Sequence, residues 1–140
     1  MILRIPLPPD IDARLATLGE IFANCPGVEF SYLFGGAASG RKTPLSDIDI
    51  ALYVEEGHDS SEIQIEVRRR VAKHLGTDEV DVVILNGAPI ALRGRILQSR
   101  QILYDRNPWR RHTFESQTAR EFTDFRKFET TLLNRRFARG

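Results

Sequence analysis

One glycine-rich segment with two aspartates behind it constrains the fold more than any other part of the chain. Residues 33–50 read LFGGAASGRKTPLSDIDI. The apolar residues on either side of the glycines predict a strand, a turn and a second strand. Because Gly35, Gly36 and Gly40 lack a Cβ, the turn can bring backbone N–H groups against an anion, and a short helix starting there would add its positive N-terminal end.

The two aspartates are the second half of this pattern. Asp47 and Asp49 are two residues apart in a predicted strand, so their side chains point to the same face. Carboxylates are the ligands that hard cations prefer, and phosphoryl chemistry needs such a cation. The segment therefore predicts a combined metal and triphosphate site.

A P-loop is the first alternative, because Gly35 and Gly40 have the spacing of its two glycines. That motif requires Lys and then Ser or Thr directly after the second glycine. Here Arg41 precedes Lys42 and Thr43, and a strand follows too soon for the P-loop helix. We therefore prefer the pattern G-G-x10-D-x-D.

Composition limits the architecture and the compartment. A chain of 140 residues is large enough for one domain but leaves little room for a separate substrate domain. Its single cysteine, Cys25, excludes an internal disulfide, and no apolar run is long enough for a signal peptide or a membrane span. We expect a cytoplasmic protein. Residues 1–105 carry a charge of −4 and residues 106–140 a charge of +5, so the C-terminal segment can meet an acidic partner.

The rest of the chain alternates helical and strand-like patterns. The spacing of apolar residues predicts a helix that ends near residues 24–27, and a cap at Asp59 or Ser60 opens another that Gly76 closes. A third apolar strand carries Asp81, and an acid in such a strand is costly unless it is paired or functional. The predicted order is helix 11–22, strand 28–34, strand 48–54, helix 60–75, strand 80–85, helix 89–98, strand 102–104 and helix 108–137.

Residues 33–36 and 46–50 resemble the signature of polymerase-beta-type nucleotidyltransferases, in which a glycine–serine turn precedes D-x-D and a third carboxylate lies on a neighbouring strand. Asp81 is placed to be that third acid. The sequence VDVVILNGAP at residues 80–89, together with apolar and charged positions between residues 92 and 105, resembles the minimal nucleotidyltransferase (MNT) antitoxins of HEPN–MNT toxin–antitoxin pairs. The resemblance covers about residues 10–105.

This resemblance implies an α/β (α+β) fold with a mixed sheet of about four strands flanked by helices. Residues 1–105 would form the minimal nucleotidyltransferase domain. Residues 106–140 would form a C-terminal helical extension packed on the domain or on a partner, within one structural domain overall.

The resemblance also implies a reaction, the transfer of AMP from ATP to a hydroxyl with release of pyrophosphate. Asp47 and Asp49 would hold Mg²⁺, and Asp81 would hold a second metal ion or take the acceptor proton. Membership of the MNT family would make the acceptor a tyrosine of a HEPN ribonuclease toxin. The residues expected to contact the nucleotide are Gly35, Gly36, Ser39, Gly40 and Ser46.

The sequence departs from the family pattern in the turn. Gly36 stands where the family has serine, and Ala37 and Ser39 stand where basic residues are often found. Gly36 keeps the backbone donors but loses one hydroxyl contact to phosphate. Two hypotheses follow: an active adenylyltransferase, which needs all three aspartates, and a catalytically weakened antitoxin that neutralises its toxin by direct binding. Transfer to a small molecule is less favoured, because the chain is too short for an acceptor pocket unless it dimerises.

The C-terminal helix has its own alternatives. The stripe formed by Phe122, Phe125 and Phe128 favours a core-facing helix over a binding surface, although the resemblance strengthens the second interpretation. Trp109 with neighbouring Phe and Arg residues is the composition of an interface anchor. No stacking-platform motif accompanies the basic residues, so we expect no direct contact with nucleic acid. A homodimer remains an alternative to the toxin complex.

Overall fold

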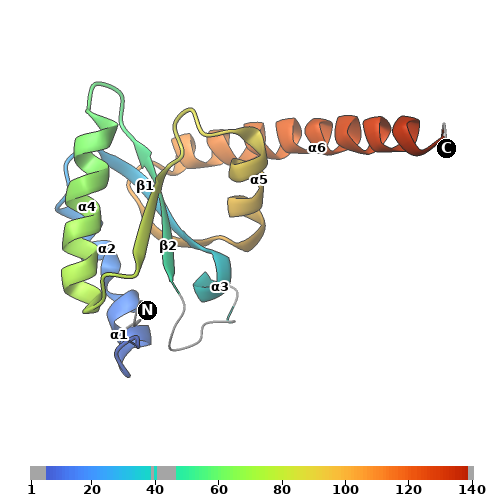
Figure 1. Ribbon diagram of the computed structural model, residues 1–140. Coiled ribbons are helices and arrows are strands. Elements are labelled where there is room, and N and C mark those ends of the chain that lie inside the picture. Colours follow the sequence, from blue (N-terminus) through green and yellow to red (C-terminus); the bar gives the residue numbers. More distant parts are fainter. Residues whose placement is uncertain (1–5, 39, 41–46, 139–140) are drawn as a thin grey trace.

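The computed structural model of the protein describes residues 6–38, 40 and 47–138. A four-stranded sheet lies between two groups of helices, and one long helix extends from the body (Figure 1). The predicted mixed sheet with a C-terminal helix is confirmed. The elements are α1 (Ile11–Ala16), α2 (Leu18–Ala23), β1 (Val28–Phe34), α3 (Gly35–Ala38), β2 (Ile48–Val54), α4 (Ser60–Leu75), β3 (Val80–Ile84), α5 (Ile90–Ser99), β4 (Gln101–Asp105) and α6 (Pro108–Ala138).

The sheet has the strand order β3-β2-β1-β4. The pairs β1–β2 and β1–β4 are antiparallel, whereas β2 and β3 are parallel with α4 as the crossover. The parallel pairing matters for function because it sets β3, which carries the third acid, beside β2, which follows the glycine segment.

Each face of the sheet has its own apolar core. On one face α1, α2 and α4 cover β-strand residues that include Ile48 and Ile50, both fully buried. On the other face Ile96 of α5 and Phe114 of α6 pack over Phe30, Tyr32 and the other inward residues of that side. Side chains alternate along a strand, so residues 47, 49 and 51 belong to the α5–α6 face.

The helix predicted over residues 11–22 is wrong in one respect, because the structure divides it at Thr17. The Thr17 hydroxyl donates to the Arg14 carbonyl at 3.0 Å, which competes with continued helical hydrogen bonding. The prediction for α4 is confirmed: the Asp59 carboxylate accepts from the backbone N–H of Ser61 and Glu62, and Gly76 ends the helix with φ of 71°. None of the described helices is long and apolar enough to cross a membrane.

The first turns of α6 are anchored by a half-buried ionic network. The Tyr32 hydroxyl donates to Glu115 Oε2 at 2.8 Å, and Arg100 donates to the same oxygen at 2.8 Å. Arg111 donates to the other carboxylate oxygen at 3.0 Å. Burial, reinforced by the Glu115 carboxylate, raises the pKa of Tyr32 far above its usual value, so the hydroxyl stays a donor.

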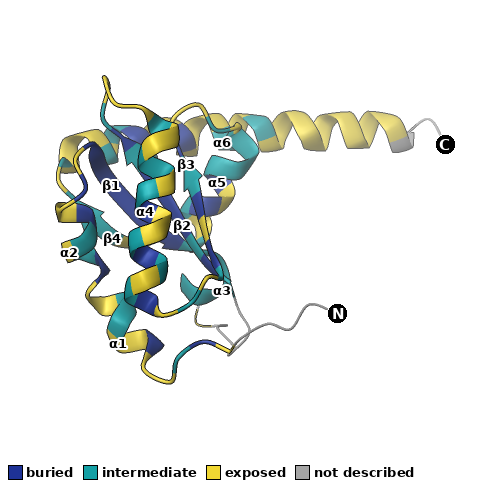
Figure 2. Ribbon diagram, turned by 60° about the vertical axis from the view of Figure 1, so that its left-hand side comes forward, coloured by how far each residue is buried: buried dark blue, intermediate teal, exposed yellow. Residues whose placement is uncertain are grey.

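The C-terminal half of α6 behaves differently from its base. It runs out from the body with exposed residues along its length (Figure 2). Phe114 is buried and Phe122 is partly buried, whereas 63% of Phe128 is exposed. The core-facing interpretation of the phenylalanine stripe is therefore right for its beginning and wrong for Phe128. Trp109, at the start of α6, is 70% exposed.

Candidate active site

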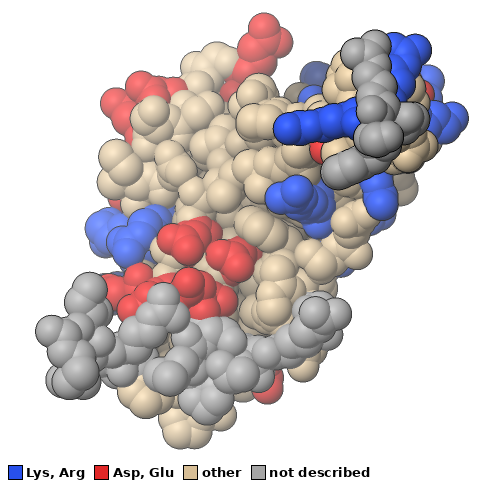
Figure 3. All heavy atoms as spheres, turned by 45° about the vertical axis from the view of Figure 1, so that its right-hand side comes forward, with Lys and Arg blue, Asp and Glu red and all other residues tan. Residues whose placement is uncertain are grey.

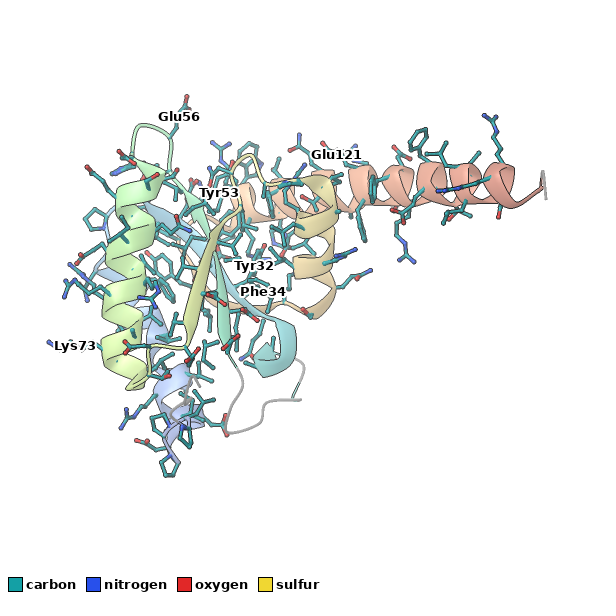
Figure 4. The ribbon with its side chains drawn as sticks, in the orientation of Figure 1. Tyr32, Phe34, Tyr53, Glu56, Lys73 and Glu121 are labelled. Carbon is teal, nitrogen blue, oxygen red and sulfur yellow. The ribbon has the colours of Figure 1, made fainter. Side chains whose placement is uncertain are left out.

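The glycine turn follows directly from the end of β1. Figure 4 shows Phe34 at this end of the strand, beside α3. Gly35 has φ of 73°, a left-handed conformation that strains any residue with a side chain. A Cβ at this position would also lie only 2.7 Å from Oδ2 of Asp49. Both requirements explain why a glycine stands between the strand and the turn.

The short helix expected to start at the glycines is present as α3, which begins at Gly35 and has four residues. Anion binding at this turn would therefore depend on individual backbone N–H groups more than on a developed helix dipole. Gly40 also has a left-handed conformation, with φ of 76°. Ser39 and Ser46, two expected nucleotide contacts, lie outside the described residues.

The sheet brings the aspartates together. Asp49 of β2 is the register partner of Asp81 on the parallel strand β3 and of Phe34 on the antiparallel strand β1. Register partners on neighbouring strands lie about 5 Å apart and point to the same face. Asp47 precedes Asp49 by two residues and so projects on that face as well. This juxtaposition follows from the parallel β2–β3 pairing.

The pKa of Asp49 also reflects the closeness of the three aspartates. Burial raises the pKa of Asp49 above its ordinary value, and the negative charges of Asp81 and then Asp47 raise it further. A cation bound among these carboxylates would relieve that repulsion, so the donor set suits Mg²⁺. In the described part of the chain, no three His, Cys, Asp or Glu side chains converge closely enough to hold a metal ion by themselves. Mg²⁺ sites of this kind use one or two carboxylates and take further ligands from substrate phosphates.

One expectation about Asp81 is wrong. We expected a buried acid whose desolvation had to be offset, but the side chain of Asp81 is exposed. β3 is an edge strand of the sheet, so Asp81 has a neighbouring strand on one side only. The charge of Asp81 therefore costs little, and its position in register with Asp49 is the better argument for a role.

Ser99 is a site residue that the sequence did not reveal. It is the last residue of α5, and its Oγ accepts a hydrogen bond from the backbone N–H of Gly35 at 3.1 Å. This bond ties the glycine turn to the end of α5, far away in the sequence. A lone serine before Arg100 belongs to no motif, so only the folded structure shows it.

The position of Gly36 is sterically open. No described atom lies within 4 Å of the place where its Cβ would be, and its φ is not in the left-handed region. The serine that the family pattern carries would therefore fit here. Packing does not explain the departure, and the missing hydroxyl changes only the polar contacts available to a bound phosphate.

The fold and this site define a class of protein. The family profile described as "Polymerase beta, Nucleotidyltransferase" matches residues 16–108, about two thirds of the chain. The chain belongs to this nucleotidyltransferase family. The match includes the glycine turn and all three aspartates. A search of curated protein sequences finds no significant match.

Several solved structures with the same fold come from toxin–antitoxin complexes. A structure of a tri-AMPylated Shewanella oneidensis HEPN toxin with its MNT antitoxin matches at a TM-score of 0.66 and 20% identity, covering 91% of this chain and 98% of that one. A toxin–antitoxin structure with AMP-PNP matches at 0.68 and 22%, covering 90% and 98%. An MntA–HepT complex matches at 0.62 and 21%, covering 91% and 97%. At these identities the likeness shows a shared fold.

Proposed function

We propose that this protein is a Mg²⁺-dependent adenylyltransferase that acts as an antitoxin, transferring AMP from ATP to a tyrosine hydroxyl of a HEPN ribonuclease toxin. The observation that carries the proposal is the in-register pairing of Asp49 with Asp81 directly beside the glycine turn. Membership of the nucleotidyltransferase family supports the reaction class. The fold shared with MNT antitoxins in HEPN complexes, one of them with a tri-AMPylated toxin, supports the partner.

The aspartates divide the chemistry between them. Asp47 and Asp49 would hold Mg²⁺, and Asp81 would hold a second ion or accept the proton of the attacking hydroxyl. Mg²⁺ supplies neutralisation of phosphate charge in the transition state. Because Asp81 is exposed, an incoming hydroxyl can reach it without rearrangement of the sheet.

The glycine turn binds the nucleotide. Gly35 lets the chain pass close to Asp49, and the residues that would contact the phosphates are Gly36, Ser39, Gly40 and Ser46. A structure of the same fold with AMP-PNP supports use of an adenine nucleotide. The tyrosine oxygen then attacks the α-phosphorus, the α–β phosphoanhydride bond breaks, pyrophosphate leaves, and the tyrosine proton passes to a carboxylate. ATP and the toxin would meet this chain in the cytoplasm.

A second candidate is an antitoxin that inhibits its toxin by occupancy. Gly36 favours it, because the turn lacks one hydroxyl of the family pattern although a serine would fit. The two candidates differ in what they require. Transfer needs Asp47, Asp49 and Asp81, whereas occupancy tolerates Asp→Asn at these positions.

The intact mass of the toxin distinguishes the candidates. A HEPN-type toxin, from the neighbouring gene where one is encoded there, is incubated with the protein, ATP and Mg²⁺. We expect a gain of one or more AMP units that Asp47→Asn/Asp49→Asn abolishes. The matched control Asp78→Asn/Asp124→Asn removes two carboxylates elsewhere in the chain and should leave the gain intact. No gain, with a stable complex still formed, would favour the occupancy candidate.

A further inference from the structure

The outer half of α6 exposes apolar side chains that run beyond the body of the domain. α6 has 31 residues, a length of about 46 Å. Leu132 and Leu133 are each 48% exposed and Phe128 is 63% exposed. An isolated helix of this kind gains little from its own hydrogen bonds in water, and most helical stability comes from a packed apolar face. We call Phe125, Phe128, Leu132 and Leu133 the outer apolar face.

This face continues the one by which α6 packs on its own domain. The ring of Phe122 lies directly against Gly94 of α5, where an added Cβ would come within 2.3 Å of the ring. Phe125 stacks on Phe122 with ring centroids 6.4 Å apart. Leu132 follows Phe125 by two helical turns and therefore lies on the same side of the helix. The contact surface thus continues past the N-terminal end of α5, where Ala91 lines a hollow with Phe125 and Glu129.

A groove between α5 and α6 leads into this face. It consists of two adjoining hollows of about 320 and 240 Å³, which share Gln98, Phe122 and Arg126. Arg95 and Arg126 edge the outer hollow. Neither arginine forms an ion pair with another residue of the described chain, although Arg126 lies over the Phe122 ring. The two hollows therefore place the Phe122 and Phe125 rings beside two arginines that have no ion-pair partner in the described chain, and the Glu129 carboxylate also lines the outer hollow.

The groove opens on the same side of the sheet as the carboxylates. Asp47 and Asp49 project on the α5–α6 face, and Ser99, next to Gln98 of the groove, holds the glycine turn. Figure 3 shows acidic side chains at the centre of this side of the molecule and Lys and Arg side chains toward the end of α6. An acceptor protein seated in the groove would contact Gln98, the chain neighbour of the serine that bonds to the glycine turn.

We propose that the α5–α6 groove and the outer apolar face are the docking surface for the acceptor protein. The proposal rests on the proposed function and adds where the acceptor binds. The surface fits a folded partner with an apolar patch edged by carboxylates, which would pair with Arg95 and Arg126. If the acceptor docks along α6, the surface that recognises the acceptor is distinct from the glycine turn that binds the nucleotide. It holds the acceptor hydroxyl near the α-phosphate, which is the main contribution positioning makes to group transfer.

The test measures binding of the HEPN-type toxin used in the mass assay by isothermal titration calorimetry. Leu132→Asp/Leu133→Asp places two charges on the outer apolar face and should weaken the complex at least tenfold. Thr131→Asp/Asn134→Asp places the same charges in the same turns away from this face and should leave it unchanged. Because these positions project from the body, circular dichroism should show an intact fold in both variants.

A second variant tests the charges. Arg95→Glu/Arg126→Glu should also weaken the complex at least tenfold, while AMP-PNP affinity stays at the wild-type value. Equal binding of the toxin by the wild-type protein and the leucine variant would overturn the proposal. The proposal would also be overturned if the wild-type protein alone forms a dimer and the leucine variant is monomeric but still binds the toxin. The outer apolar face would then be a homodimer interface. A complex that depends on α6 but shows no AMP transfer would sustain the docking surface while refuting the adenylyltransferase.

Discussion

Gly35→Ala tests the geometry that joins the glycine turn to the carboxylates. Gly35 and Gly87 share a left-handed conformation, with φ of 73° and 74°, but only Gly35 faces a neighbour. A side chain in this conformation costs about 1–2 kcal/mol, and the reduced freedom of the unfolded chain returns about 0.4–1 kcal/mol. Both variants should therefore lose about 1 kcal/mol of unfolding free energy.

The rate of AMP transfer should distinguish Gly35→Ala from Gly87→Ala. A Cβ at position 35 lies 2.7 Å from Asp49 Oδ2, and ordinary contact begins at 3.4 Å, so the carboxylate must move by about 0.7 Å. A carboxylate oxygen can rotate away at little cost in stability. A displacement near 1 Å in a reacting group costs about 10²-fold in rate, so we expect a roughly 10- to 100-fold loss of AMP transfer in Gly35→Ala.

The assays are urea denaturation for stability, AMP incorporation into the toxin for rate, and calorimetry with AMP-PNP and Mg²⁺ for affinity. Gly87→Ala should match the wild type in the last two. The reasoning is refuted if Gly35→Ala transfers AMP as fast as Gly87→Ala at equal stability. If the wild-type protein transfers no AMP, the affinities of the two variants for AMP-PNP and Mg²⁺ still test whether Gly35→Ala disturbs the site.

Three further predictions concern Asp49, Glu115 and Ser99. Because the pKa of Asp49 is raised in the folded state, the folded protein binds this proton more tightly than the unfolded chain does. In metal-free buffer the free energy of unfolding should therefore fall as pH rises from the ordinary aspartate pKa through the raised pKa of Asp49. Urea denaturation at a series of pH values measures this fall, and Asp49→Asn should reduce it. Glu115→Ala leaves the buried Tyr32 hydroxyl without its acceptor, whereas Arg111 keeps its ion pair with Asp105, and thermal denaturation should show a loss of about 1–3 kcal/mol. Ser99→Ala removes the acceptor for the Gly35 N–H, so the KM for ATP should rise with stability nearly unchanged, and Ser99→Thr should restore it; an unaltered KM would assign Ser99 no positioning role.

The local pattern of the sequence was enough for most elements. The cap at Asp59 and the stop at Gly76 set α4, because both act within one turn of the chain. The glycine–aspartate segment predicted a turn and a strand whose acids share one face, because side-chain alternation is a local property. Thr17 shows the limit of such patterns, since the structure divides there a helix that periodicity alone would continue.

The site itself needed the fold. No local rule pairs Asp49 with Asp81, because their contact depends on the parallel register of two strands separated by α4. The exposure of Asp81 follows from the place of β3 at the sheet edge, and the role of Ser99 follows from where α5 ends. Residue types and spacing thus determined the chemistry this chain can offer. Long-range packing decided which groups meet, because strand order and helix placement are set by the burial of both sheet faces and leave no mark in any short segment.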